Sequence, residues 1–122
     1  MAVTIGDVAT ALADTLVTDS AVSDASGVQA NSGATTLYCV KGDGTSTTST
    51  SYIKAWDATS GTPDSNNPDY IFPVPAGSEV EYIAMEGNAL AAGLRYWGTS
   101  TRANGSAQSA TIGTLAAKFL LS

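Results

Sequence analysis

The 122-residue chain has no histidine and a single cysteine, and these two shortages exclude several kinds of chemistry. Without histidine, the usual Ser-His and Cys-His catalytic pairs cannot be assembled. Cys39 cannot form an intrachain disulfide, nor can it complete a zinc site made of cysteine and histidine. We expect Cys39 to be a small buried hydrophobic residue, as free cysteines usually are. We therefore expect a protein that is not an enzyme and that carries no metal or cofactor.

Positive charge is also scarce, and the net charge is −6. A nucleic-acid-binding surface needs a basic patch, and a net negative charge repels phosphate, so we expect no nucleic-acid partner. No apolar run reaches the roughly 18 residues of a membrane span, and the N-terminus lacks the basic and apolar regions of a signal peptide. We expect synthesis in a cytoplasm-like compartment. The basic residues are scattered along the chain: Lys41, Lys54, Arg95, Arg102 and Lys118.

Charged residues of both signs make up only 13% of the chain, about half the usual fraction of roughly 25%. Ser, Thr, Gly and Ala take their place, and the short polar residues among them suit turns and strand surfaces better than helices. The length is that of one domain. Composition therefore favours a single domain rich in strands.

Alternating apolar and polar residues predict strands from residue 34 onward. Residues 36–41 are rich in β-branched and aromatic side chains, and Gly42-Asp43-Gly44 carries a turn signal. Residues 50–57 place Ile53 and Ala55 on one face and the larger side chains on the other. Two strands joined by an Asp-Gly turn predict a hairpin.

Turn-forming residues divide the rest of the chain into short strands. The strand over 70–74 contains Pro73, which cannot donate to a ladder, so an edge position or a bulge is expected. In the strand over 79–85, Glu79, Glu81, Ile83 and Met85 share one face. The remaining expected elements are a loop over 58–69, a turn over 75–77, a Gly/Ala-rich segment over 86–93, a strand over 94–97 and a strand over 110–121.

The pattern as a whole predicts an all-β fold, an antiparallel β-sandwich that is jelly-roll-like and has an N-terminal arm. Residues 1–15 form the arm or a short helix, since apolar residues recur there at helical spacing, and residues 16–122 form the sandwich. The helical positions are Ile5, Val8, Ala9, Leu12 and Leu16.

Two groups of side chains could carry chemistry, and each also has a simple structural explanation. Glu79 and Glu81 share a strand face, which suits a carboxylate pair but is usually a solvated surface. Four residues around the 58–69 loop offer oxygen ligands for Ca²⁺, but their spacing does not match the helix–loop–helix calcium motif, and a solvated turn is expected. They are Asp57, Asp64, Asn66 and Asp69.

Residues 36–97 resemble a known kind of protein. After a first strand, four segments carry the resemblance: residues 52–58 (Tyr-Ile-Lys-Ala-Trp-Asp-Ala), 67–72 (Asn-Pro-Asp-Tyr-Ile-Phe), 74–78 (Val-Pro-Ala-Gly-Ser) and 93–95 (Gly-Leu-Arg). They resemble small β-sandwich capsid decoration (cement) proteins encoded near the capsid genes of tailed bacteriophages, including cyanophages. The resemblance covers about half of the chain, and its motifs are turns and strand faces.

The resemblance implies a structural virion protein that binds the outer capsid surface and stabilises the shell by bridging capsomers. It implies the major capsid protein as partner, location on the virion, and self-association, with a trimer favoured. Two alternatives stay open: a tail- or fibre-associated carbohydrate-binding module that would use Tyr96 and Trp97, and a head–tail connector component. The residues expected at protein contacts are Val3, Ile5, Val8, Leu12, Tyr70, Tyr96, Trp97 and Arg102.

Overall fold

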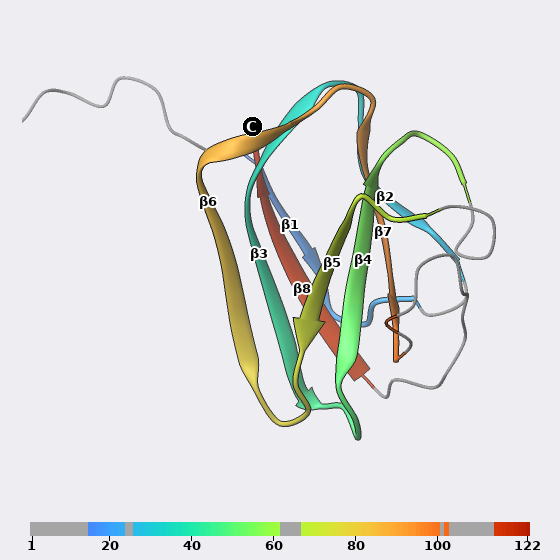
Figure 1. Ribbon diagram of the computed structural model, residues 1–122, viewed down its shortest axis with the longest axis vertical. Coiled ribbons are helices and arrows are strands. Elements are labelled where there is room, and N and C mark those ends of the chain that lie inside the picture. The colour runs from blue at the N-terminus through green and yellow to red at the C-terminus, as the bar shows by residue number, and fades with distance from the viewer. Residues whose placement is uncertain (1–14, 24–25, 62–66, 101, 103–113) are drawn as a thin grey trace, which may run out of the picture.

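The computed structural model describes residues 15–23, 26–61, 67–100, 102 and 114–122, which form two four-stranded antiparallel sheets (Figure 1). Sheet A has the strand order β1-β8-β3-β6, and sheet B has the order β2-β7-β4-β5. The prediction of an all-β sandwich is confirmed. The strands are β1 (Thr15–Asp19), β2 (Val28–Ser32), β3 (Thr35–Ser46), β4 (Ser51–Asp57), β5 (Tyr70–Val74), β6 (Glu79–Leu90), β7 (Gly93–Thr99) and β8 (Thr114–Leu121).

The strand pairing has the topology of a jelly roll. β1 pairs with β8, β2 with β7, β3 with β6 and β4 with β5, so the first four strands pair with the last four in reverse order. Two further pairs, β3 with β8 and β4 with β7, complete the sheets. Such a fold is a long hairpin rolled into two facing sheets.

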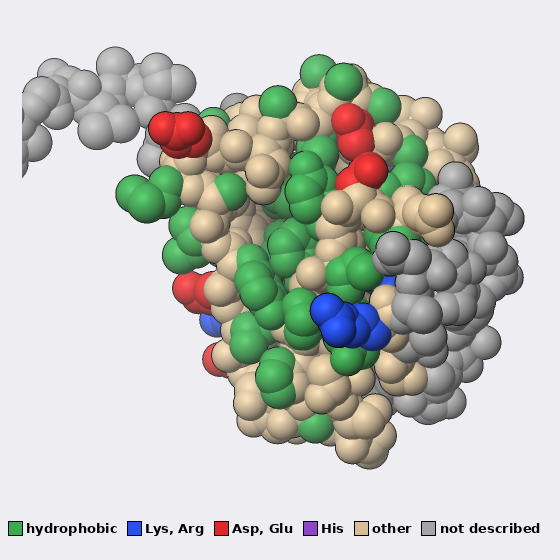
Figure 2. Space-filling view, viewed as in Figure 1, with side chains coloured by type: hydrophobic (Ala, Val, Ile, Leu, Met, Phe, Trp, Pro, Cys, Tyr) green, Lys and Arg blue, Asp and Glu red, His purple; other side chains and the backbone are tan. Residues whose placement is uncertain are grey.

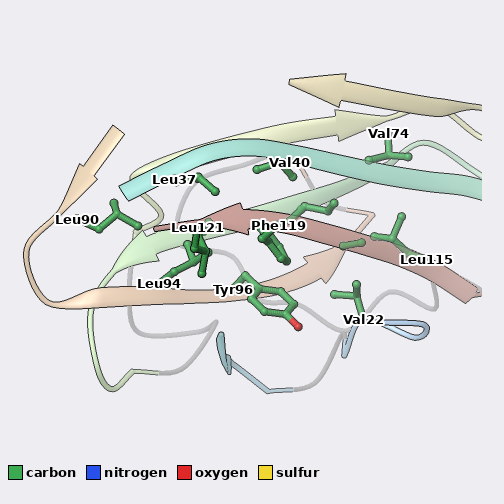
Figure 3. Close-up of a cluster of buried hydrophobic side chains, with 13 residues drawn as sticks. Val22, Leu37, Val40, Val74, Leu90, Leu94, Tyr96, Leu115, Phe119 and Leu121 are labelled. Carbon is green, nitrogen blue, oxygen red and sulfur yellow. The ribbon is translucent and has the colours of Figure 1, made fainter. Parts of the chain in front are cut away.

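The core lies between the sheets and follows the alternation of the sequence (Figure 3). Strand β8 shows this most clearly, because Leu115, Ala117, Phe119 and Leu121 are buried and the residues between them are more exposed. Strand β4 contributes Ile53 and Ala55, which the alternation had placed together on one face. Alternation therefore decides which side chains of these strands reach the core.

The predicted hairpin over residues 36–57 is wrong, because β3 belongs to sheet A and β4 to sheet B. Gly42-Asp43-Gly44 lies inside β3 and is not a turn. Both glycines are buried, and a Cβ atom on Gly42 would collide with the side chain of Val74, while one on Gly44 would lie 2.6 Å from the Pro75 carbonyl oxygen. The glycines allow the two sheets to approach closely at this end of the sandwich.

Strand β6 is longer than expected and is strongly bulged. In the register with β3, Leu37 lies opposite Asn88 and Cys39 opposite Ile83, so residues 84–87 face the single Tyr38. Gly87 has a φ of +79°, a conformation that favours glycine. The Gly/Ala-rich segment is therefore partly a bulge within a strand.

Two further expectations, for the strand that contains Pro73 and for the N-terminal segment, have different outcomes. Strand β5 lies at the edge of sheet B, as Pro73 predicted. Leu16 lies in β1, so the helical spacing that includes it does not continue into this part of the chain. Residues 1–14, the predicted arm, lie outside the described residues.

Candidate functional site

The outer face of sheet A carries a row of apolar side chains that crosses all four strands. Leu16 of β1 pairs with Leu120 of β8, Leu120 pairs with Cys39 of β3, and Cys39 pairs with Ile83 of β6. Residues paired across a sheet point to the same face, so these four form one continuous row. We call Leu16, Cys39, Ile83, Leu120 and the neighbouring Met85 the apolar stripe.

Much of the stripe is open to solvent. Ile83 is 68% exposed, Met85 is 88% exposed and Leu16 is 58% exposed. A shallow groove of about 460 Å³ follows part of the stripe and is also lined by Tyr38, Ala84 and Glu81. Single exposed apolar residues are common, but a contiguous exposed row marks a candidate interaction site.

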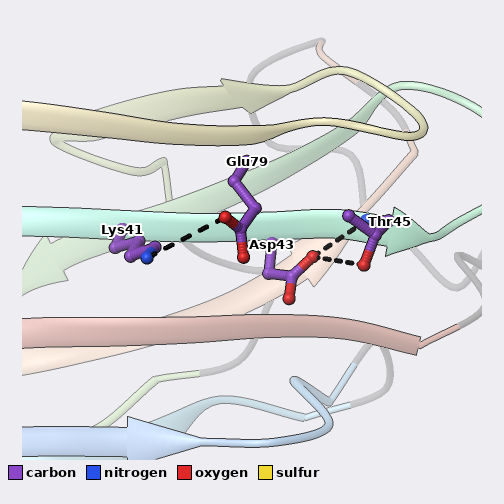
Figure 4. A network of polar contacts seen from close by, with 4 residues as sticks. All are labelled: Lys41, Asp43, Thr45 and Glu79. Atoms are coloured by element: carbon purple, nitrogen blue, oxygen red, sulfur yellow. Dashed lines mark hydrogen bonds and ion pairs between the residues drawn. The ribbon is translucent and has the colours of Figure 1, made fainter.

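Two rows of charged side chains lie beside the stripe on the same face. Lys41 of β3 pairs with Lys118 of β8 and with Glu81 of β6, and in the next row Asp43 pairs with Glu79. The Lys41 ammonium lies 4.0 Å from a Glu79 carboxylate oxygen, and Asp43 accepts hydrogen bonds from the hydroxyl and the backbone N–H of Thr45 (Figure 4). The hydrogen bonds from Thr45 lower the pKa of the Asp43 carboxyl. The charges border the stripe on one side.

Cys39 sits inside the stripe and is partly exposed. The expectation of a buried cysteine is wrong, because the register turns Cys39 to the outer face together with Ile83. Partial desolvation, and then the negative charge of Glu81, raise the pKa of the Cys39 thiol. The thiol is therefore accessible, but it is a weaker nucleophile near neutral pH than an ordinary one.

A second apolar region lies where β5 and β6 form one open side of the sandwich. Tyr70 and Phe72 of β5 stack with ring centroids 6.1 Å apart, and Phe72 lies 5.2 Å from the ring of Tyr82 on β6. The Tyr82 hydroxyl donates a hydrogen bond to the Pro73 carbonyl. Figure 2 shows hydrophobic side chains gathered between the two sheets on this side. A hollow of about 180 Å³ beside Tyr82 is also lined by Phe72, Tyr38 and Asn88.

The outer face of sheet B is different, because its large side chains are buried. Trp56 and Trp97 pack edge to face with ring centroids 4.4 Å apart. The Lys54 ammonium lies 6.0 Å from the Trp97 ring, and the Arg95 guanidinium lies 5.8 Å from the Trp56 ring. Lys54 and Trp97 have no exposed surface, and burial lowers the pKa of Lys54. We call these four residues the tryptophan cluster.

Tyr96 and Trp97, two of the residues expected at protein contacts, are buried instead. Trp97 is 0% exposed and Tyr96 is 1% exposed, so neither side chain is available to a partner or to a sugar in this fold. The Tyr96 ring is in the core against Phe119, and its hydroxyl donates a 2.6 Å hydrogen bond to Asp19. Burial and this contact raise the pKa of Tyr96 strongly. The two rings point to opposite faces of sheet B, because they are adjacent in β7. Tyr96 packs in the core against Phe119, and Trp97 packs on the outer face against Trp56 and Lys54.

Of the remaining residues expected at protein contacts, two lie within the described part of the chain. Tyr70 is half-buried against Phe72, and Arg102 is exposed. The four residues of the predicted arm, Val3, Ile5, Val8 and Leu12, lie outside the described residues.

The apolar stripe itself was not predicted as a site. The alternation over 79–85 already placed Ile83 and Met85 on the face of Glu79 and Glu81. Two glutamates on one strand face indicate that the face is exposed to solvent. The sequence could therefore have predicted that Ile83 and Met85, on the same face, are exposed apolar residues. The contributions of Leu16 and Leu120 depend on the pairing of β1 with β8, which the sequence pattern does not reveal.

Asp57 has a structural role. Its carboxylate accepts hydrogen bonds from the backbone N–H groups of Ala91, Ala92 and Gly93, at 2.9, 2.7 and 3.1 Å. These bonds, led by those from Ala92 and Ala91, lower the pKa of Asp57. Asp69 in turn accepts a 2.8 Å hydrogen bond from the Asp57 N–H. Asp64 and Asn66, the other candidate calcium ligands, lie outside the described residues.

Two features are absent from the described part of the chain. No group of three or more cysteine, aspartate or glutamate side chains is arranged there to hold a metal ion. That part also contains no helix long and apolar enough to cross a membrane. Comparison of the chain with family models, with curated proteins and with solved structures finds no match.

Proposed function

We propose that this protein is a structural virion component that binds the outer surface of a phage capsid and stabilises the shell by bridging capsomers. The observation that supports this proposal most is the apolar stripe on sheet A. Exposed Ile83, Met85 and Leu16 lose contact with water when a partner covers them, which is the main driving force of protein association. The partner is the major capsid protein.

The jelly-roll topology is compatible with this role but does not select it, because viral capsid proteins and lectins both use the fold. The resemblance of residues 36–97 to capsid decoration proteins favours a capsid shell as the binding partner. The sugar-binding alternative loses its expected residues, because Tyr96 and Trp97 are buried. The head–tail connector alternative uses the same kind of contact and differs in copy number.

Stabilisation follows from linkage. A protein that binds only the assembled shell shifts the equilibrium between free subunits and shell toward the shell. Each contact can be weak, because the symmetry of the shell repeats it many times and self-association of the protein, with a trimer favoured, adds avidity.

The proposal is tested by adding the purified protein to shells stripped of it and measuring co-sedimentation. Replacing both Ile83 and Met85 with aspartate places charges in the stripe, and we expect shell affinity to fall at least about tenfold. The variant in which both Pro75 and Ala76 are replaced with aspartate is the matched control, since both residues are exposed in the turn between β5 and β6, away from the stripe. Equal binding by the stripe variant and the wild type would show that the stripe is not the docking surface. About a dozen copies per virion, instead of hundreds, would favour the connector alternative.

A further inference from the structure

Strand β6 forms an edge of sheet A and pairs, within the described residues, with β3 alone. An edge strand has backbone N–H and C=O groups directed away from its sheet, and such groups can bind an extended segment as an additional strand. The regular part of this edge runs from Glu79 to Ile83, because residues 84–87 form the bulge. Five residues correspond to about 17 Å of strand.

The side chains along this edge have a definite pattern. Glu79, Glu81 and Ile83 point to the outer face, with Ile83 at the end of the apolar stripe and both glutamates exposed. Val80 and Tyr82 point inward, toward the open side of the sandwich where Phe72 lies. A segment added beside β6 would thus meet an acidic and apolar outer face and an apolar inner face.

We infer that this edge binds an extended segment that carries two basic residues opposite Glu81 and Glu79 and an apolar residue opposite Ile83. The inner residues of the segment are apolar and cover Val80 and Tyr82. The apolar residue opposite Ile83 lengthens the stripe across a fifth strand, and the basic residues bring opposite charges to the glutamates.

The charges argue against a second copy of the same strand at this edge. Antiparallel pairing of β6 with itself around Glu81 places Glu81 opposite the Glu81 of the second copy and Glu79 opposite Ile83. Like charges directly opposite one another are destabilising, and Glu79 gains no opposite charge. Charged residues on edge strands commonly prevent such self-pairing. The same electrostatics favours a basic segment.

The inference deepens the proposed function, on which its biological meaning rests, because it states what kind of shell segment the protein binds. It is tested without a shell, with the full-length protein and the synthetic peptide Thr-Ile-Val-Lys-Val-Lys-Thr. Fluorescence anisotropy of the labelled peptide measures its affinity. The matched acidic peptide has glutamate in place of both lysines, and we expect it to bind at least about tenfold more weakly.

A charge reversal locates the binding. Glu81→Lys is expected to weaken binding of the basic peptide about fivefold and to strengthen binding of the acidic peptide. Glu86→Lys makes the same charge change in the bulge, outside the regular edge, and should alter both affinities less than Glu81→Lys does. A basic peptide in which the valine between the two lysines is replaced by N-methylvaline lacks one backbone donor and should also bind more weakly.

The inference is overturned if the basic peptide does not bind, or if Glu81→Lys and Glu86→Lys affect binding equally, since general electrostatic attraction would then explain the result. Peptide binding by a protein that fails to bind shells would count against the proposed function alone. Shell binding by a protein that ignores the peptide would count against this inference alone.

Discussion

The outer faces of the two sheets differ in how far their large side chains are exposed to solvent. On sheet A, Ile83 and Met85 are 68% and 88% exposed, whereas on sheet B Lys54 and Trp97 have no exposed surface. The isoleucine is thus open to water and the lysine is not, the reverse of what hydrophobicity alone predicts. Strand alternation decides which face a residue occupies, but it does not decide whether that face is covered.

The difference indicates what each face contributes. The tryptophan cluster on sheet B contributes to the stability of the fold, because large buried rings contribute strongly to folding energy. The apolar stripe on sheet A contributes little to the stability of the isolated chain, since its side chains remain largely hydrated. The free energy that these side chains gain on burial is therefore still available for binding a partner. Substitutions on the two faces test whether sheet B contributes to folding stability and sheet A to binding.

The largest effect is expected from Trp97→Ala. Removing a fully buried indole loses its apolar contacts and leaves a cavity, which costs about 3–5 kcal/mol of unfolding free energy. Neither indole N–H of the Trp56–Trp97 pair has a hydrogen-bond acceptor in the described structure, so Trp97→Phe should cost less than Trp97→Ala. Urea unfolding followed by circular dichroism measures all of these values.

Met85→Ala on the other face is the comparison for Trp97→Ala. Met85 is almost fully exposed, so we expect its substitution to change the unfolding free energy by less than about 0.5 kcal/mol. Similar losses for Met85→Ala and Trp97→Ala would contradict the division of roles between the two faces.

An intermediate effect is expected from Asp57, which lies at the end of β4 in sheet B and accepts three backbone hydrogen bonds. Its pKa is lowered in the folded protein, so the stabilisation is present above the unfolded pKa of about 3.9 and is lost as the pH falls through the folded pKa. Asp57→Asn should reduce the unfolding free energy by about 1–2 kcal/mol at pH 7, and the reduction should become smaller as the pH falls toward 2.

Glu81→Gln provides the matched comparison, because Glu81 is an exposed carboxylate on sheet A. We expect its effect on the unfolding free energy to be small across the same pH range. A difference between wild type and Asp57→Asn that does not change between pH 7 and pH 2 would mean that the carboxylate charge is not responsible.

The sequence predicted the strands better than their partners. Alternation correctly grouped Ile53 with Ala55 on one face of a strand, and Pro73 correctly indicated an edge strand. Gly42-Asp43-Gly44 was mistaken for a turn, since a glycine that permits close packing of two sheets looks the same in sequence as a glycine that permits a turn.

The candidate site was harder to predict for a related reason. Trp97 was expected to contact a partner because of its residue type, but its burial depends on what surrounds it in three dimensions. The apolar stripe joins residues from four strands, with Leu16 and Ile83 separated by most of the chain. Only the register brings them into one row, and local patterns do not specify the register of distant strands.

The smallest effect is expected at Cys39, the single cysteine of the chain and a member of the apolar stripe. Cys39 is partly exposed, so its thiol should react with a thiol reagent in the folded protein without prior unfolding.

A substitution at Glu81 should change the rate of this reaction. Desolvation and then the negative charge of Glu81 raise the pKa of Cys39, and Glu81→Gln removes that charge, so the thiolate fraction at pH 8 should increase. We expect the rate to rise about twofold, because the thiolate is the reacting form. The rate is measured with an excess of a chromogenic disulfide at a urea concentration well below the unfolding transition. A rate that increases with urea in proportion to the unfolded fraction would instead mean that Cys39 is covered in the folded protein, and that the stripe is not open to solvent.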